Sequence, residues 1–233
     1  MIDVLSKIII LYPIFLILYF SVCYLVAQYV KRVPDKKIQK VKVRSNIKKD
    51  ISSSVISLFF AAFFLSLGLH FQTIGIANEG SFTGIAVLDF VIEVIVGLFL
   101  FDTVFYWGHR FFHINKTVFK ATHLSHHKNN APTVWGCYNE NILGLIIPQS
   151  FFAYIVFIMP ISMPALIFLN FYAMFLDIVG HSGYDISPRV PFTFFTAVPD
   201  HDLHHKYYDC NYAPYFTVWD KIMKTYREYI PSK

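Results

Sequence analysis

The sequence predicts an all-α, multi-pass integral membrane protein. Of its 233 residues, 55% are hydrophobic and only 15% are charged, which is far more apolar than an ordinary soluble domain. Three long apolar runs, at residues 8–30, 51–77 and 85–107, are the expected spans. The first has no charged residue and would form a helix of about 34 Å at roughly 1.5 Å per residue, enough to cross a bilayer.

The segment between the first two runs is strongly basic. Residues 31–49 read "KRVPDKKIQKVKVRSNIKK" and contain nine Lys or Arg and one Asp. A short basic loop between two apolar spans is typical of the cytoplasmic side, so the net charge of +5 indicates topology and does not favour nucleic-acid binding. Counting crossings from this loop places His109, which follows the third run, on the same cytoplasmic side.

Two shorter apolar runs, 142–159 and 165–179, follow. Pro148 lies inside the first, and Pro160 and Pro164 flank the turn between them, which predicts a helical hairpin that returns the chain to the side it left. All histidine clusters then share one cytoplasmic face.

We therefore divide the chain into two parts. Residues 1–98 carry the N-terminal spans with the cytoplasmic basic loop 31–50, and residues 99–233 form a histidine-rich candidate catalytic domain that includes the hairpin at about 142–180. Three cysteines show no C-x-x-C spacing and fall in a span or on the cytoplasmic face, so free thiols are expected. They are Cys23, Cys137 and Cys210.

Nine of the ten histidines fall in the motifs "HRFFH", "HLSHH", "GHSGYD" and "HDLHH". Spacings of three or four residues place side chains on one helical face with Cβ atoms about 5–6 Å apart, a suitable geometry for ligating one metal or two adjacent metals. The nine are His109, His113, His123, His126, His127, His181, His201, His204 and His205. The tenth, His70, stands alone near the end of the second run and is expected to be an ordinary hydrogen-bonded core or interfacial residue.

The clustering predicts metal binding. Protonated imidazoles so close together would repel one another, and neutral ones buried without partners would each carry a desolvation cost, whereas a metal accepts their lone pairs. Nine imidazoles exceed the needs of one tetrahedral zinc or one iron facial triad, which favours two metals with four or five nitrogen ligands each. The chain lacks H-E-x-x-H, so a zinc protease is disfavoured. A nearly all-imidazole pair points to iron and dioxygen chemistry on a lipid.

Acidic residues in the third run need protein or metal partners. Asp102 lies on the helical face of His109 and His113, so this polar stripe must turn away from lipid. Asp89 and Glu93 would each cost about 2.5–3.5 kcal/mol if exposed to lipid at mid-bilayer. They are expected to line a polar cavity or to lie near the interface.

The segments "DTVFYWGHRFFH", "HLSHH", "HSGYD" and "HDLHH" resemble the signature of the fatty-acid hydroxylase and sterol desaturase superfamily of membrane di-iron oxygenases. The resemblance extends over about residues 99–226. Within the superfamily, "HSGYD" and the tail "HDLHHKYYDCNYAPYFTVWDKIMKTY" are most similar to the cholesterol 25-hydroxylases, with the 4-methyl sterol oxidases next.

The resemblance implies a monooxygenase that uses dioxygen and two electrons. It implies that the nine histidines ligate two Fe²⁺ ions, which zinc can replace in preparations. Electrons from NAD(P)H would arrive through a separate reductase and a small cytochrome b-type carrier. The substrate would be a sterol or another lipid from the bilayer, and in a eukaryote the enzyme would occupy the endoplasmic reticulum membrane with its active site facing the cytoplasm.

The chain departs from its relatives at two positions. Asp200 stands where close relatives often have a further histidine, and Glu140 lies near a histidine of the 4-methyl class. Glu140, or Asp177 four residues before His181, is therefore a candidate tenth ligand or a hydrogen-bond partner of a ligand.

Metal-bound imidazoles usually donate their second nitrogen to a carboxylate, carbonyl or amide. Asp102, Asp202 and Asn211 stand near the histidine motifs and are expected to serve in this way. Arg110 and Asp220 are expected to pair on the cytoplasmic surface. The aromatic segment 191–199, "PFTFFTAVP", fits a lipid interface beside the site.

Two other readings stay open at this point. Histidine spacing does not distinguish a sterol hydroxylase from a 4-methyl sterol oxidase, a sterol desaturase or a fatty-acid hydroxylase. A membrane lipid-binding protein with a structural metal site is the non-enzymatic alternative.

The topology makes a testable prediction at the glycosylation sequon Asn115–Thr117. Because the positive-inside count places it in the cytoplasm, expression in a glycosylating host should give no mobility shift on glycosidase treatment. Sugar on Asn115 would reverse the assigned sidedness.

Overall fold

The computed structural model describes residues 2–41, 46–78, 80–187 and 194–230. Within these ranges the regular structure is helical, and the β-pairing consists of two isolated bridges. The elements are α1 Ile2–Val30, η1 Pro34–Lys36, α2 Ile47–Thr73, α3 Ala86–Ile114, α4 Lys116–Thr122, α5 Leu124–His127, η2 Val134–Gly136, α6 Ile142–Ile158, α7 Met163–Gly180, α8 Val198–Tyr207 and α9 Val218–Ile222.

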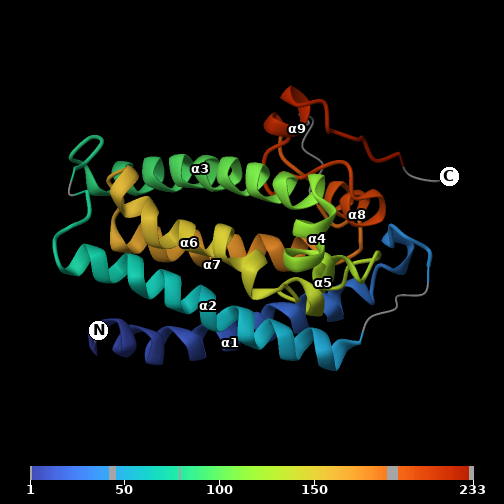
Figure 1. Ribbon diagram of the computed structural model, residues 1–233, viewed down its shortest axis with the longest axis horizontal. Coiled ribbons are helices and arrows are strands. Elements are labelled where there is room, and N and C mark those ends of the chain that lie inside the picture. Colours follow the sequence, from blue (N-terminus) through green and yellow to red (C-terminus); the bar gives the residue numbers. More distant parts are fainter. Residues whose placement is uncertain (1, 42–45, 79, 188–193, 231–233) are drawn as a thin grey trace.

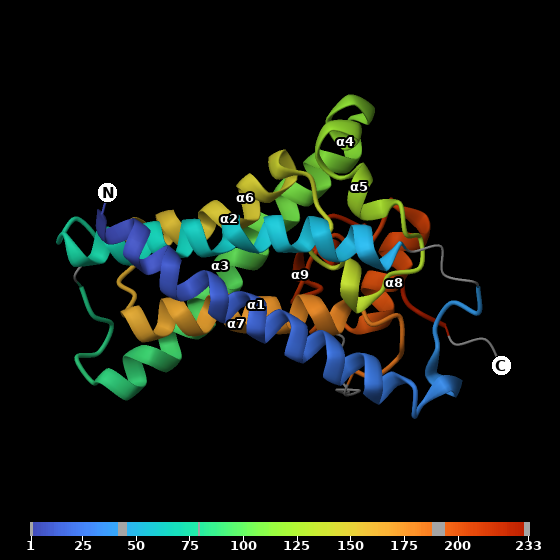
Figure 2. The same cartoon turned by 90° about the horizontal axis from the view of Figure 1, so that it is seen from below.

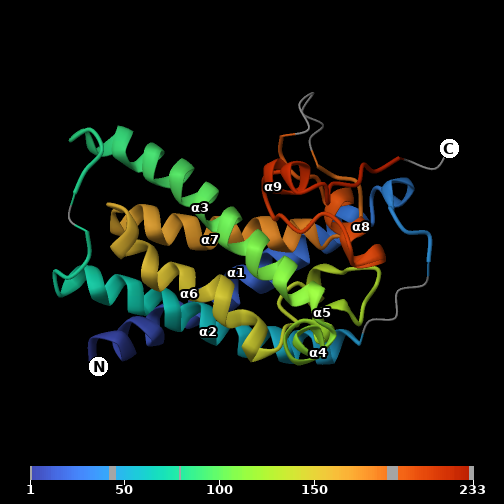
Figure 3. The ribbon, with the colours of Figure 1, turned by 45° about the horizontal axis from the view of Figure 1, so that its top comes forward.

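Five long helices form the bundle, and the short helices gather at one of its ends (Figure 1). Helix α2 packs against α1 and α6, while α1 runs obliquely across α2 and α7 (Figure 2). Helix α3 lies over α6 and α7 (Figure 3). The buried core includes Phe15, Leu65, Phe151 and Leu166, one from each of α1, α2, α6 and α7. The N-terminus lies at the end opposite α4, α5, α8 and α9 (Figure 1).

The predicted all-α, multi-pass membrane fold is confirmed. Helices α1, α2 and α7 are long and apolar enough to cross a membrane, and α6 is a shorter apolar helix of 17 residues. Helices α6 and α7 form the expected hairpin, with Pro148 inside α6. Helix α3 has 29 residues, as many as α1, but carries acidic side chains, so its crossing stays a prediction. All three cysteines are free, as expected.

The basic segment lies at the same end of the bundle as the histidine motifs. The main chains of Lys37 and Tyr184 form an isolated antiparallel β-bridge. The Gln39 side-chain amide donates a 2.8 Å hydrogen bond to the Asn130 carbonyl. Because Tyr184 follows "GHSG" and Asn130 follows "HLSHH", the hairpin does return the chain to the side of the basic loop. The assignment of that side to the cytoplasm stays a prediction.

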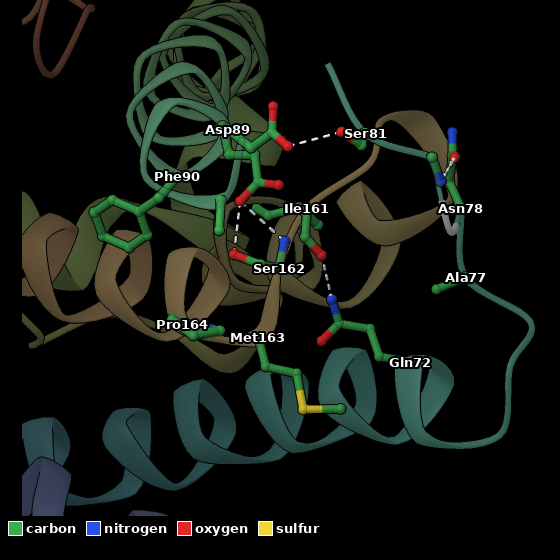
Figure 4. A pocket seen from close by; sticks show the side chains of 13 residues that line it. Gln72, Ala77, Asn78, Ser81, Asp89, Phe90, Ile161, Ser162, Met163 and Pro164 are labelled. Carbon is green, nitrogen blue, oxygen red and sulfur yellow. Dashed lines mark hydrogen bonds between the residues drawn. The ribbon is translucent and has the colours of Figure 1, made fainter. Parts of the chain in front are cut away.

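Two acidic side chains of α3 accept hydrogen bonds from the turns at the opposite end of the bundle. The Ser81 hydroxyl and the Thr83 amide donate to Asp89, and the Ser162 amide and hydroxyl donate to Glu93 at 3.0 and 2.7 Å. Together with Gln72, both acids line a cavity of about 470 Å³ (Figure 4). Asp89 and Glu93 therefore line a cavity, but apolar side chains form more of its lining than polar ones. Their bonds hold the chain turns before α3 and α7.

His70 has a partner that its sequence neighbours did not suggest. Its Nδ1 lies 2.7 Å from Asp3 Oδ2 in α1, and Lys7 also contacts that carboxylate. This pairing joins α1 to α2 at the end remote from the other nine histidines. Asp3 was overlooked because it is distant in sequence.

Close packing of α2 on α6 makes a stability prediction at Gly68. A Cβ there would lie 2.1 Å from the Phe152 carbonyl oxygen, so Gly68→Ala must push the helices apart and should cost about 1–3 kcal/mol. Gly180→Ala is the matched control, because a Cβ there meets no atom within 4 Å. Thermal unfolding in detergent should show a lower Tm for Gly68→Ala only. Equal Tm values would contradict this packing.

Candidate metal centre

The structure brings all nine predicted histidines together in two groups at one end of the bundle. In each group every residue offers one candidate ligand atom, and these atoms lie within 4.8 Å of one another. The first group is His109, His113, His123, His127 and His204. The second is His126, His181, His201 and His205. This is the partition into five and four nitrogens that the count of imidazoles predicts.

Helical periodicity decides which group each histidine joins. His123 and His127 are four residues apart and share the first group, whereas His126 between them belongs to the second. In α8 the assignment is reversed, because His201 and His205 share the second group and His204 joins the first. In each motif the two histidines four residues apart face the same group, and the remaining histidine faces the other group. Each three-histidine motif therefore serves both groups.

Main-chain carbonyls fix the orientation of three imidazoles. Nδ1 lies 2.8 Å from the Tyr212 carbonyl in His109, 2.8 Å from the Cys210 carbonyl in His204 and 2.7 Å from the Asp177 carbonyl in His181. A carbonyl can only accept, so each Nδ1 carries the proton and donates it. The Nε2 atom of each neutral ring then keeps its lone pair.

The Nε2 atoms face inward at short range. Nε2 of His109 lies 2.9 Å from that of His123, and Nε2 of His204 lies 3.0 Å from that of His127. In the second group, Nε2 of His181 lies 3.0 Å from that of His126. Two nitrogens bound about 2.1 Å from one metal at right angles would be about 3.0 Å apart, so this donor set fits a metal with several imidazole ligands.

Burial keeps these rings uncharged. His204 is fully buried and His205 is 1% exposed. Burial lowers the pKa of His127, His204 and His205 well below the usual histidine range, and neighbouring imidazoles lower it further. Proton binding therefore does not satisfy the converging lone pairs, and the two groups indicate a metal site.

Two buried acids shape the loop that presents the carbonyls. The amides of Tyr212 and Ala213 donate to the two carboxylate oxygens of Asp220, each at 2.9 Å. The amides of Tyr215 and Phe216 donate to Oδ1 of Asp102 at 2.8 and 3.0 Å. Asp102 thus turns the stripe on α3 toward protein, as expected, while the Tyr212 carbonyl is left pointing at His109.

Asp220 does not lie on the surface, and the expected pair with Arg110 was wrong. It is 1% exposed and holds backbone amides, and no ion pair joins it to Arg110 among the described residues. Arg110 instead donates to the Tyr106 hydroxyl at 3.2 Å. The signal in the sequence was the position of Asp220 beside the loop that follows the last histidine motif. The hydrogen bonds from imidazoles to the Cys210 and Tyr212 carbonyls could not be predicted, because every residue has a main-chain carbonyl.

The five acidic or amide residues expected behind the histidines behave differently. Oε2 of Glu140 lies 2.9 Å from Nδ1 of His123, and Oδ1 of Asp177 lies 3.3 Å from Nδ1 of His181, so both are in contact with an imidazole.

In contrast, no hydrogen bond joins Asp102, Asp202 or Asn211 to a histidine ring in the described part of the chain, and direct support from them was wrongly expected. Asp102 is seven residues from His109, about 10 Å along the helix. The Asn211 amide bridges the Asp200 and Arg227 carbonyls, each at 3.0 Å.

Asp200, at the position where the resemblance led us to expect a further histidine, has a structural partner. Its Oδ2 accepts a 2.8 Å bond from the Ala197 amide at the start of α8, and burial raises its pKa to about 6. It therefore orders the helix that carries three of the histidines. In the segment 191–199, residues 191–193 lie outside the described residues, while Phe194 and Phe195 are exposed beside Phe216.

Comparison with known proteins identifies relatives of the histidine-bearing part. Residues 94–225 match the family Fatty acid hydroxylase. The chain is 30% identical to cholesterol 25-hydroxylase of Rattus norvegicus over 58% of its own length and 47% of the relative. It is 31% identical to sphinganine C4-monooxygenase 2 of Arabidopsis thaliana, over 60% and 56%, and 28% identical to human lathosterol oxidase, over 58% and 44%. It spans about half the length of these curated relatives. No solved structure matches the chain.

The loop geometry makes a prediction at Asp220. Asp220→Asn leaves one carbonyl oxygen for two amide donors, so the Tyr212 carbonyl should lose its fixed position and metal affinity should fall about 10–100-fold. Metal content after equilibrium dialysis measures this. Asp209→Asn is the control, because that carboxylate is 71% exposed and its 3.6 Å pair with Arg227 is worth little. Equal metal affinity in both variants would refute the role of the loop.

Proposed function

Because the chain belongs to the fatty acid hydroxylase family, we propose that it is a membrane-bound non-haem di-iron monooxygenase that hydroxylates a sterol. The specific proposal is hydroxylation of the cholesterol side chain at carbon 25, with dioxygen and two electrons. The observation that carries the di-metal oxygenase part of the proposal is the pair of imidazole groups whose Nε2 atoms converge at 2.9–3.1 Å.

The nine histidines are the proposed ligands, five at one centre and four at the other. Five nitrogens exceed a tetrahedral zinc site, which favours iron, although zinc could occupy the same atoms in a preparation. Iron bound there would supply the activation of dioxygen, a task for which no side chain of the chain has suitable chemistry.

The protein itself contributes position and dryness. Three imidazoles donate Nδ1–H to main-chain carbonyls, which leaves the Nε2 lone pair free to face its group. No proton then has to leave Nε2 before a metal binds. Aromatic side chains pack beside the first group. Phe105 lies 5.2 Å from His109 and Phe119 lies 5.1 Å from His113, centroid to centroid. These rings, one on α3 and one on α4, place apolar surface beside the first group.

A sterol substrate is supported by the names of two relatives and by the "HSGYD" and "CNYAPYFTVWDK" segments. An apolar bundle suits a lipid that enters from the bilayer, and carbon 25 of cholesterol is tertiary, with a weaker C–H bond than a secondary carbon. A fatty-acid or sphingoid-base hydroxylase is the second candidate, because the Arabidopsis thaliana relative matches equally well. A 4-methyl sterol oxidase, a sterol desaturase and a non-catalytic lipid-binding protein complete the alternatives.

Electrons are proposed to come from NAD(P)H through a separate reductase and a cytochrome b-type carrier. The chain carries no flavin, nicotinamide or haem motif. The carrier would dock at the end of the bundle that holds the histidines, the short helices and the basic segment. We assign this end to the cytoplasm, at the endoplasmic reticulum membrane in a eukaryote.

Cells that express the protein with a suitable reductase should accumulate 25-hydroxycholesterol that carries label from isotopic dioxygen and none from water. Untargeted lipid mass spectrometry measures the product. Unchanged sterols with a new hydroxylated or unsaturated acyl chain would transfer the proposal to the second substrate class.

The controls separate chemistry from folding. His126→Ala and His204→Ala each remove one proposed ligand from a different group and should abolish turnover. His70 lies at the other end of the bundle, so the His70→Ala variant should retain turnover. A double variant lacking His126 and His204 that stayed fully active would exclude the metal chemistry.

A further inference from the structure

Glu140 lies behind one imidazole of each group. Its Oε2 is 2.9 Å from Nδ1 of His123, which belongs to the first group, and 3.9 Å from Nδ1 of His126, which belongs to the second. The two rings are stacked, with centroids 4.9 Å apart and an angle of 27° between their planes. The contacts are thus on the outer nitrogens, and the inner Nε2 atoms are left for a metal.

Two polar atoms at this place have no partner in the described part of the chain. They are the second carboxylate oxygen of Glu140, Oε1, and Nδ1 of His126, and both are buried. An imidazole whose Nε2 lone pair is used by a metal must carry its proton on Nδ1, where it needs an acceptor. A shift of about 1 Å would bring the carboxylate to hydrogen-bond distance from His126 as well as His123.

Glu140 has no lysine or arginine beside it among the described residues. Its side chain is only 11% exposed, and its ion-pair contacts go to these two imidazoles. A buried carboxyl group needs hydrogen-bond partners, and the outer nitrogens of His123 and His126 are the ones within reach.

The chain holds this carboxylate in place from two sides. The side-chain amides of Asn129 and Asn139 donate to buried Asp50 at 3.2 and 2.8 Å, which ties the segment before Glu140 to α2. On the other side, a Cβ on Gly144 would lie 2.7 Å from the Thr122 carbonyl oxygen and 2.8 Å from Oε1 of Glu140, so glycine leaves room for both the main chain and the carboxylate.

We propose that Glu140 is a positioning residue shared by the two metal groups, which accepts the Nδ1–H of His123 and of His126 and so couples the two centres. The inference rests on the proposed di-metal function. It differs from direct ligation, because a direct ligand would serve the metal it binds, whereas a shared acceptor orients one ligand of each.

The test is an anaerobic titration of the metal-free, full-length protein in detergent with Co²⁺, followed by absorption. Wild-type protein should bind two ions. Glu140→Ala removes both acceptors and should weaken both binding steps, each by about 10–100-fold. Glu140→Gln keeps the shape and one acceptor oxygen, but its NH₂ group cannot accept from the other ring, so it should weaken one step only.

Asp177→Ala is the matched control. The Asp177 carboxylate faces His181 of the second group alone, and the backbone carbonyl that also holds His181 is retained, so one step at most should weaken. Thermal unfolding of the metal-free variants shows whether each is folded. If Glu140→Ala is not, Glu140→Leu replaces it, because leucine also has no acceptor but fills most of the same space.

Three results would overturn the inference. They are a Glu140→Ala titration identical to wild type, loss of a single step in Glu140→Ala as for a direct ligand, and a Glu140→Gln titration identical to wild type. Wild-type protein that bound no Co²⁺ would instead overturn the proposed function, and the inference with it.

Discussion

Nine imidazoles with their ring nitrogens turned toward one another are the constraint on which this end of the molecule depends. Without a metal, each pair of Nε2 atoms at 2.9–3.1 Å can share at most one proton in a hydrogen bond, whereas a cation would accept the lone pairs of a whole group. Charging the rings does not resolve this crowding, because burial lowers the pKa of His204 and His205. The arrangement therefore indicates a metal-binding site, and the surrounding groups hold the rings in place.

The groups that fix the orientation of the imidazoles do not themselves face the metal position. The Cys210 and Tyr212 carbonyls set the tautomers of His204 and His109. The peptide that carries the Tyr212 carbonyl is held by the bond from the Ala213 amide to Asp220, and the peptide that carries the Cys210 carbonyl by the bond from the Asn211 amide to the Thr225 carbonyl. Asn211, between them, has a φ of 53°, in the left-handed region that asparagine tolerates better than most residues. Asp220 thus orders the loop, the loop carbonyls orient the imidazoles, and the imidazoles form the proposed metal site.

Sequence reasoning predicted the parts of this system that depend on periodicity. Apolar runs identified the five long helices, and histidine spacing predicted the nine members of the site and their division into two sets. It failed where the interaction runs through the main chain or through residues distant in sequence. Asp220 resembled a surface acid because its partners are amides, and Asp3 was not linked to His70 because 67 positions separate them. Asp102 and Asn211 were assigned to imidazoles because nearness in sequence was taken for nearness in space.

The same distinction explains why the reaction class follows from this site more directly than the substrate does. Relatives named for cholesterol, sphinganine and lathosterol match the chain at 28–31% identity over 58–60% of its length. Membership of the family therefore does not choose among these lipids. One hydrocarbon contact differs from another by only about 1–3 kcal/mol, so apolar contacts can change which lipid is preferred while the nine imidazoles stay the same. The exposed rings of Phe194 and Phe195 pack beside Phe216, whose amide donates to Asp102, so an apolar surface lies next to the loop that follows the last histidine motif.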